Sequence, residues 1–199
     1  MKALPRILLA VTAVAALSVA YPAKANLITN GDFETGNFAG WATLVQSDGN
    51  LSVTHGPGPN TTFGATFAST GSFPDFIIQT FATTPGTFYT LTFFYQVVST
   101  GTANNEFDVF WNNISVGSPF PNLNANSGFG TFTFHEKATG TSTDLAFGGR
   151  NAAGFDFLDN VSVTKAVPDG GWTVSLLGCA LLGLATLRRK LPLLRARKS

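Results

Sequence analysis

The chain has 199 residues and a formal net charge of +1 at pH 7, but its charges are unevenly distributed. The stretch 26–169 contains eleven acidic residues against three basic ones, Lys137, Arg150 and Lys165, so it carries a formal charge of −8. Nucleic-acid binding needs a basic surface that replaces the counterions around phosphates, and this composition excludes it. The single cysteine, Cys179, lies beyond this stretch, which excludes an internal disulfide there.

The first 25 residues have the three parts of a secretory signal peptide. Lys2 and Arg6 form a charged start, residues 7–20 are apolar, and Ala23-Lys24-Ala25 is a small-x-small cleavage site. We therefore expect cleavage before Asn26 and export of the remaining chain. A first transmembrane helix is the alternative, which the short apolar stretch disfavours.

Residues 26–166 have the pattern of one all-β domain. Apolar side chains occupy every second position from Tyr89 to Val97, and the alternation recurs at Phe107, Val109 and Trp111. Further strands are expected at 41–47, 51–55, 62–69, 76–82, 130–136, 143–148 and 155–164. Clusters of Gly, Pro, Asn and Ser separate these segments. Together they predict a jelly-roll-like two-sheet sandwich.

The strand around residue 110 contains the best candidates for sugar binding. Stacking on sugar rings requires an exposed aromatic side chain with amide or carboxylate groups beside it. Trp111, Asn112 and Asn113 meet this requirement and are the predicted ligand-binding residues. Asp108 and Phe110 would lie on the opposite face of the strand together with Asn112, and either face could be the binding one.

Both ends of the domain carry a family resemblance. The domain begins Asn26-Leu27-Ile28-Thr29-Asn30-Gly31-Asp32-Phe33-Glu34, and its last strand contains Phe155-Asp156-Phe157-Leu158-Asp159-Asn160-Val161-Ser162-Val163. These stretches resemble the opening and closing strands of galactose-binding-like carbohydrate-binding modules. The resemblance implies that the two strands lie near one another, but it marks a fold and specifies no ligand.

The same resemblance implies a structural calcium ion that joins the two chain ends. The matching positions are Glu34 and Asp159, with Asp32 as a local addition. Because calcium binds about six to eight oxygen ligands, backbone carbonyls and water would have to complete the shell. The alternative is that Asp159 makes turn hydrogen bonds and Glu34 is solvated.

The last 33 residues form a three-part signal. A short motif, Val167-Pro168-Asp169-Gly170-Gly171, precedes the apolar run 172–187, and the basic tail 188–199 begins Arg188-Arg189-Lys190. As a helix the run would be about 24 Å long, slightly short for a hydrocarbon core of about 30 Å. Since basic clusters remain on the cytoplasmic side, we expect a transmembrane helix with the domain outside.

This tail resembles the PEP-CTERM sorting domain in its Val-Pro-Asp variant. The resemblance implies a Gram-negative protein that is exported through the inner membrane to the cell envelope, outer surface or extracellular matrix, and an exosortase-type protease that processes the tail. Gly170 stands where the variant usually has Ser, which leaves the particular processing enzyme open. The alternative is a permanent membrane anchor.

Enzyme chemistry has few residues to use. His55 and His135, the two histidines, are 80 residues apart, and no motif selects a pair of catalytic carboxylates. We therefore expect a non-enzymatic surface or matrix protein that associates with extracellular polysaccharide. A dedicated carbohydrate-binding module with a defined sugar site is the first alternative, and a polysaccharide hydrolase is the second.

Overall fold

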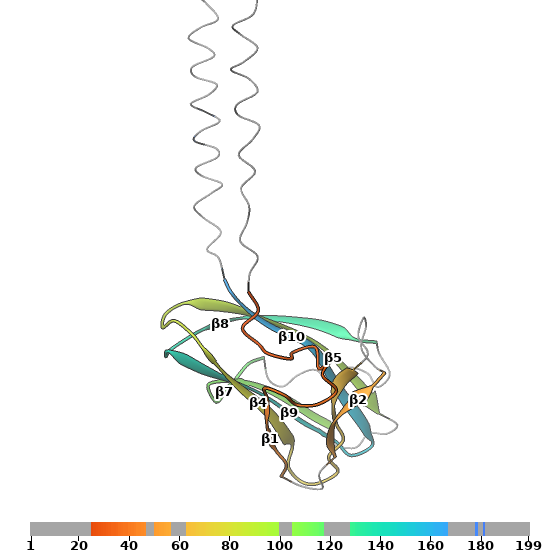
Figure 1. Ribbon diagram of the computed structural model, residues 1–199. Helices are drawn as coiled ribbons and strands as arrows, with labels where there is room; N and C mark the ends of the chain where they lie inside the picture. Colours follow the sequence, from red (N-terminus) through yellow and green to blue (C-terminus); the bar gives the residue numbers. More distant parts are fainter. Residues whose placement is uncertain are drawn as a thin grey trace, which may run out of the picture.

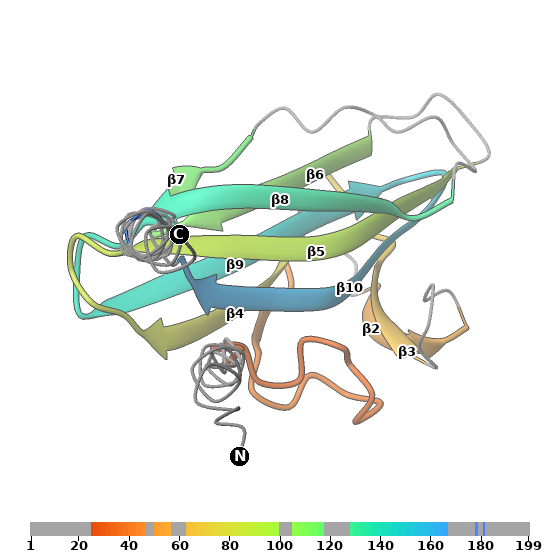
Figure 2. The same ribbon diagram turned by 90° about the horizontal axis from the view of Figure 1, so that it is seen from above.

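The computed structural model describes residues 25–46, 50–56, 63–99, 105–117 and 128–166, together with Gly178 and Leu181. Within these residues the chain forms two five-stranded antiparallel sheets (Figure 1). Seen from above, β8, β5 and β10 lie over β6, β9 and β4, so the sheets pack face to face (Figure 2). The arrangement confirms the predicted all-β two-sheet sandwich.

Strands that are neighbours in each sheet are mostly distant in the sequence, as is typical of jelly rolls. Sheet A contains, in spatial order, β1 (Ala42–Leu44), β4 (Asp75–Ala82), β9 (Ser142–Asn151), β6 (Asn105–Trp111) and β7 (Ile114–Ser115). Sheet B contains β2 (Leu51–His55), β3 (Phe63–Phe67), β10 (Gly154–Lys165), β5 (Phe88–Ser99) and β8 (Gly130–Lys137). The predicted strand 41–47 is shortened to β1, and β7 has no counterpart among the predicted strands.

Aromatic side chains fill most of the space between the sheets. The alternation predicted for β5 is confirmed, since the inward side chains Tyr89, Leu91, Phe93, Tyr95 and Val97 are all buried. Phe93 is central to this core, with its ring centroid between 5.2 and 6.4 Å from those of Phe107, Phe132, Phe134 and Phe147. Each such pair contributes about 0.5–1.5 kcal/mol beyond area burial. The phenylalanine-rich composition therefore stabilises a domain that has no disulfide.

Residues 27–31 of the opening segment pack along β10, although they form no assigned strand, and turns follow as far as residue 40. The Leu27 N–H donates to the Val163 carbonyl (2.9 Å), and the Val161 N–H donates to the Gly31 carbonyl (2.8 Å). Glycine is needed at position 31 because a Cβ there would lie 2.1 Å from the Val161 oxygen. The two described chain ends consequently lie side by side, as the resemblance implied (Figure 1).

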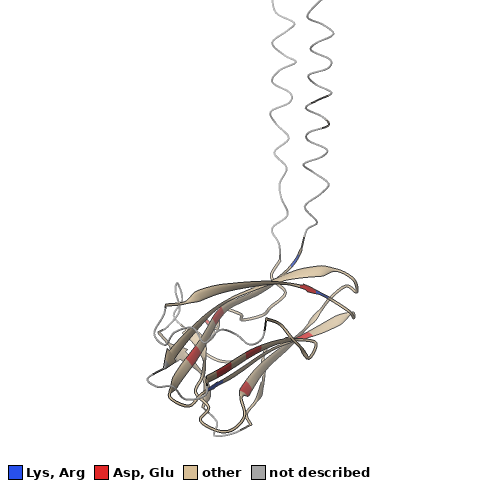
Figure 3. Ribbon diagram, turned by 180° about the vertical axis from the view of Figure 1, so that it is seen from behind, with Lys and Arg blue, Asp and Glu red and all other residues tan. Residues whose placement is uncertain are grey.

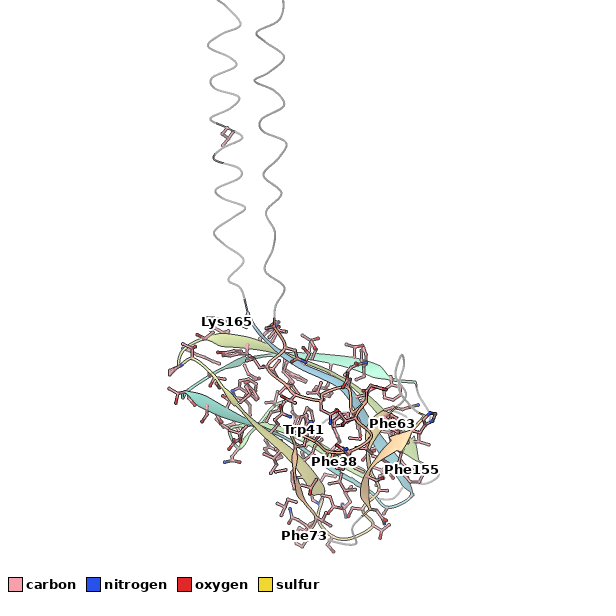
Figure 4. The ribbon with its side chains drawn as sticks, viewed as in Figure 1. Phe38, Trp41, Phe63, Phe73, Phe155 and Lys165 are labelled. Carbon is pink, nitrogen blue, oxygen red and sulfur yellow. The ribbon has the colours of Figure 1, made fainter. Side chains whose placement is uncertain are left out.

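The opening segment also supplies aromatic rings to the core. Trp41 is 7% exposed, its ring stacks on Phe33 at 5.8 Å, and its Nε1 donates to the Asn30 carbonyl (3.1 Å). Phe38 packs against the edge of Phe33 at 6.2 Å (Figure 4). These contacts fix the opening turn to the sandwich.

Both predicted targeting signals lie almost wholly outside the described residues. These include residues 1–24 and the sorting residues Val167, Pro168, Asp169, Gly170, Gly171, Arg188, Arg189 and Lys190. Of the run 172–187, Gly178 and Leu181 are described, and both are helical. Within the described residues, no helix combines the length and the hydropathy needed to span a bilayer.

Candidate functional site

Trp111 lies in the core and has no face available for stacking on a sugar. Its side chain is 3% exposed, and its ring packs 5.7 Å from that of Phe81 and 6.2 Å from that of Tyr89. The prediction that Trp111 contacts ligand required an exposed ring, so the structure corrects it. The physical reason is the direction of β6: Phe107, Val109 and Trp111 point between the sheets.

Asn112 and Asn113 form the tight turn between β6 and β7. Both have positive φ angles, 49° and 61°, which asparagine tolerates better than most residues. The Asn112 Oδ1 accepts a hydrogen bond from the Asp144 N–H (2.9 Å), and the Asn112 N–H donates to the Asp144 carbonyl (2.9 Å). Asn112 therefore holds the turn against β9, whereas Asn113 is exposed.

The outward side chains of sheet A form a continuous surface, the sheet A face. Residues directly opposite one another in antiparallel strands point to the same side. One row across the strands consists of Leu44, Phe76, Gly148 and Asp108. The next row consists of Ala42, Ile78, Ala146 and Phe110. The face that sequence alternation assigned to Asp108 and Phe110 is thus the one that meets solvent.

Two half-buried phenylalanines lie at the centre of the sheet A face. The ring centroids of Phe76 and Phe110 are 6.1 Å apart and the rings are tilted by 50°. Gly148 lies beneath Phe76, and a Cβ at this position would come within 2.3 Å of the Phe76 ring. The absence of a side chain at 148 therefore lets the Phe76 ring lie over the backbone of β9 towards Phe110.

Charged groups border the aromatic pair at one end of the face. Arg150 Nε lies 3.6 Å from Glu106 Oε2, and Arg150 Nη1 donates to the Gly71 carbonyl (3.1 Å). Burial raises the pKa of Asp108, and the neighbouring Glu106 carboxylate raises it further. Acidic segments occur on several strands of the sandwich (Figure 3). Among the described residues of this face, Arg150 is the one cation and is already paired with Glu106, so the face disfavours an anionic ligand.

The opposite end of the face carries neutral and acidic hydrogen-bonding groups. Thr80 Oγ1 donates to Asp144 Oδ1 at 2.6 Å, and Asn112 lies next to them in the turn after β6. The sheet A face thus presents apolar rings flanked at both ends by groups that can bond hydroxyls. Phe76 is the residue that sequence reasoning missed, because a mostly apolar run such as 76–78 gives no sign of which side faces solvent.

The predicted calcium ligands Glu34 and Asp159 converge near the start of β3. Glu34 Oε1 accepts a hydrogen bond from the Phe63 N–H (3.0 Å). Asp159 is fully buried, its Oδ1 accepts from the Asn160 N–H (2.6 Å), and its Cβ lies 3.9 Å from where a Gly64 Cβ would be. Asp32 is exposed, and its Oδ1 accepts from the Glu34 N–H (3.4 Å).

The described residues contain no cluster of three or more His, Cys, Asp or Glu side chains that could hold a metal ion. A cation between Glu34 and Asp159 would therefore depend on backbone carbonyls and water for most of its ligands. The two histidines do not meet, because His55 is on β2 and His135 is on β8, at opposite edges of sheet B.

Comparison with known proteins identifies the tail and the fold separately. Residues 166–191 match the model of the VPDSG-CTERM motif. No curated protein matches the sequence. Among solved structures, the family 16 carbohydrate-binding module-2 shares 20% identity at a TM-score of 0.50, over 70% of this chain and 99% of that one.

Two further structures show the same fold. The CBM22-1 xylan-binding domain from Paenibacillus barcinonensis Xyn10C has a TM-score of 0.51 and 14% identity, over 75% of this chain and 99% of that one. The enzymatically active domain of bacteriophage CBA120 tailspike protein 4 has a TM-score of 0.54 and 14% identity. The match covers 71% of this chain but spans only 21% of the tailspike chain.

Identities this low establish the fold and not a ligand. The motif match confirms the predicted sorting tail, although the processing enzyme stays a prediction. The chain is therefore similar to carbohydrate-binding modules in its jelly-roll sandwich, and its VPDSG-CTERM tail is that of an exported protein sorted to the cell surface.

Proposed function

We propose that this is a non-enzymatic protein of a Gram-negative cell surface or extracellular matrix that associates with polysaccharide through the sheet A face. The observation that carries this proposal is the pair Phe76 and Phe110, which lies half-buried over Gly148 on the outer side of sheet A. Aromatic rings cover the apolar faces of sugars, and bordering carboxylate, amide and guanidinium groups bond hydroxyls. An open sheet face suits an extended chain.

The acids of the sheet A face support binding over hydrolysis. Glu106 and Asp108 are on the same side of β6 and close enough for the Glu106 carboxylate to raise the pKa of Asp108, whereas the two carboxyl groups of a glycosidase stand about 5–9.5 Å apart with the glycosidic bond between them. Glu106 is also held by Arg150. This arrangement supports a role of the two carboxyl groups in binding hydroxyls.

Binding is tested with full-length protein in a detergent that has no sugar headgroup, against a panel of neutral and acidic polysaccharides. The double variant Phe76→Ala/Phe110→Ala should lose at least tenfold in affinity for the polysaccharide that the wild type retains. Phe88→Ala is the matched control, because Phe88 is 53% exposed but lies on sheet B. Unchanged affinity in the double variant, or release of sugar products by the wild type, would overturn the proposal.

The delivery route is part of the proposal. Export, recognition of Val167-Pro168-Asp169 by an exosortase-type protease in the membrane and removal of the tail would leave residues 26 to about 169 at the surface. The mass of the protein recovered from its host, with its location by fractionation, tests this route. If the recovered protein still contains residues 170–199 and is found in the membrane fraction, the tail is a permanent anchor and is not processed.

A structural calcium ion completes the proposal. Glu34 and Asp159 would supply carboxylate oxygens beside the start of β3, and carbonyls of the opening turn would supply others. Such an ion would tie the opening segment to β10 in place of a disulfide. The melting temperature should rise with added calcium and fall with chelator.

Asp159→Asn should abolish this calcium dependence. Asp144→Asn is its matched control, because Asp144 is an exposed acid on sheet A. Equal melting temperatures with calcium and with chelator in the wild type would show that the protein binds no structural calcium ion.

A further inference from the structure

A cavity lies at the end of the sandwich where β9 turns into β10. It has a volume of about 450 Å³, within the range of about 300–1,000 Å³ that is usual for small-molecule sites. Its walls come from the turn 151–155 and from the ends of β2, β3 and β5, and its polar lining consists of Asn50, Thr70 and Asn151. We call this cavity the hairpin pocket.

Phe155 forms an aromatic wall of the hairpin pocket. It is 47% exposed, and its ring stacks on that of Phe157 with centroids 6.0 Å apart and planes 23° apart. Stacking holds the Phe155 ring in place although much of it meets solvent. Phe155 is near the start of β10, at the opposite end of that strand from Lys165 (Figure 4).

Asn151 supplies a fixed polar group. Its side chain is 1% exposed, its Nδ2 donates to Asp156 Oδ1 (3.1 Å), and its Oδ1 accepts from the Ala153 N–H (3.3 Å). An amide has two N–H donors and two oxygen lone pairs. The two bonds use one donor and one lone pair, and they fix the orientation of an amide that lines the pocket wall but is almost wholly buried.

The chemistry of the walls restricts the ligand. Every described residue that lines the hairpin pocket is uncharged, so none of them offers a countercharge to a phosphate, sulfate or uronate. Apart from Asn50, Thr70 and Asn151, the lining is apolar, with Ala68, Val98, Ala152 and Ala153 opposite or beside Phe155. Short side chains leave room for a methyl group. The pocket fits a neutral sugar that bears a methyl substituent.

We propose that the hairpin pocket binds one such sugar unit at the end of a glycan chain, with an acetamido or 6-deoxy group in the apolar part and the ring on Phe155. This site is separate from the sheet A face, since Asn151 is the one lining residue on a strand of sheet A and none of the residues named for that face lines the pocket. Where both sites are occupied, one domain joins two glycan chains, and the second contact gains from effective concentration. This cross-linking step rests on the proposed function, whereas the pocket itself does not.

The test uses full-length protein in a detergent without a sugar headgroup and measures affinity by calorimetry. The probes are the disaccharide of N-acetylglucosamine, L-fucose and, for comparison, the unsubstituted disaccharide of xylose. The wild type should bind at least one methyl-bearing probe more tightly than the xylose disaccharide. Phe155→Ala should weaken that binding at least tenfold, and Ala153→Leu, which fills the pocket, should do the same.

Two controls separate this inference from the proposed function. Phe88→Ala, which leaves the pocket lining unchanged, and the sheet A double variant Phe76→Ala/Phe110→Ala should both bind the probe as the wild type does. If only the double variant loses the probe, the sugar binds on the sheet A face and the hairpin pocket is overturned, while the proposed function stands. Absence of binding by either methyl-bearing probe, or full binding by Phe155→Ala, would also overturn it.

Discussion

Both sides of β6 carry aromatic side chains, but one side faces the core and the other faces outward. Trp111 and Phe107 point into the core, where each is at most 6% exposed. Asp108 and Phe110 point outward onto the sheet A face beside Phe76. The tryptophan beside the two asparagines is therefore a packing residue, and the phenylalanine next to it is the ring that reaches the outer surface. Residue type alone does not distinguish an aromatic ring that packs from one that binds.

The largest expected difference between the two sides is in stability. Trp111→Ala should lower the free energy of unfolding by about 3–5 kcal/mol, because it removes a buried ring and leaves a cavity. Phe110→Ala, on the outer side of the same strand, should cost less than about 1.5 kcal/mol and leave the fold intact. Urea unfolding of both variants makes the measurement. Similar losses would mean that the sheet A face is a packing surface.

A buried carboxyl group on β10, that of Asp156, should make the stability of the protein depend on pH. Burial raises the pKa of Asp156 to about 7, although hydrogen bonds from Asn151 and Tyr95 act in the opposite direction. The folded protein then keeps a proton that the unfolded chain releases above about pH 4. Stability from this group should consequently fall by about 1.4 kcal/mol per pH unit between about pH 4 and pH 7, and stay level above.

Asp156→Asn should remove this decline and make the protein more stable than the wild type at pH 8. Thermal and urea unfolding at pH 5 and pH 8 measure the effect. Asp144→Asn serves as the control, because Asp144 is an exposed acid of sheet A and should leave the decline unchanged. If the stability of the Asp156→Asn variant declines as steeply with pH, another titratable group causes the decline.

The smallest expected difference is between alanine substitutions at two adjacent glycines of β9, Gly148 and Gly149. A Cβ at Gly149 would lie 2.5 Å from the buried Phe67 ring, and a Cβ at Gly148 would lie 2.3 Å from the half-buried Phe76 ring. Gly149→Ala should cost about 1–3 kcal/mol, since the core cannot move aside. Gly148→Ala should cost less, because Phe76 can swing outward, but it should weaken polysaccharide binding. Equal losses of stability in the two variants, with unchanged polysaccharide binding, would contradict the proposal that Phe76 lies on the surface and contacts the polysaccharide.

The sequence was sufficient to predict the sandwich, because its strands alternate with period 2 and glycine-rich or proline-rich turns separate them. The adjacency of the chain ends followed from resemblance and is confirmed by the bonds of Leu27 and Val161 to their partners. The candidate site was predicted on β6 with either face left open, and the structure shows that Trp111 faces the core whereas Phe110 faces outward. Alternation separates Trp111 from Phe110 without fixing which of them faces the second sheet.

Other parts of the site depend on long-range pairing that no local pattern contains. Phe76 and Phe110 are on strands separated by β9, and the Phe76 ring can lie over β9 because Gly148 beneath it has no side chain. The hairpin pocket likewise combines Asn50, Val98 and Phe155 from three separate strand ends. Spacing along the chain cannot reveal such groupings, whereas the register of the sheets does.

The most direct test of the central claim is to map a bound oligosaccharide by NMR on the isotope-labelled protein. Fragments of the polysaccharide that the protein retains would be titrated, and shifts of backbone and aromatic signals followed. We expect the largest shifts in the signals of Phe76, Phe110, Asp108 and Gly148, whereas the signals of Trp111 should stay nearly unchanged. Shifts that leave β4, β6 and β9 unaffected would contradict the assignment of the sheet A face as the polysaccharide-binding surface.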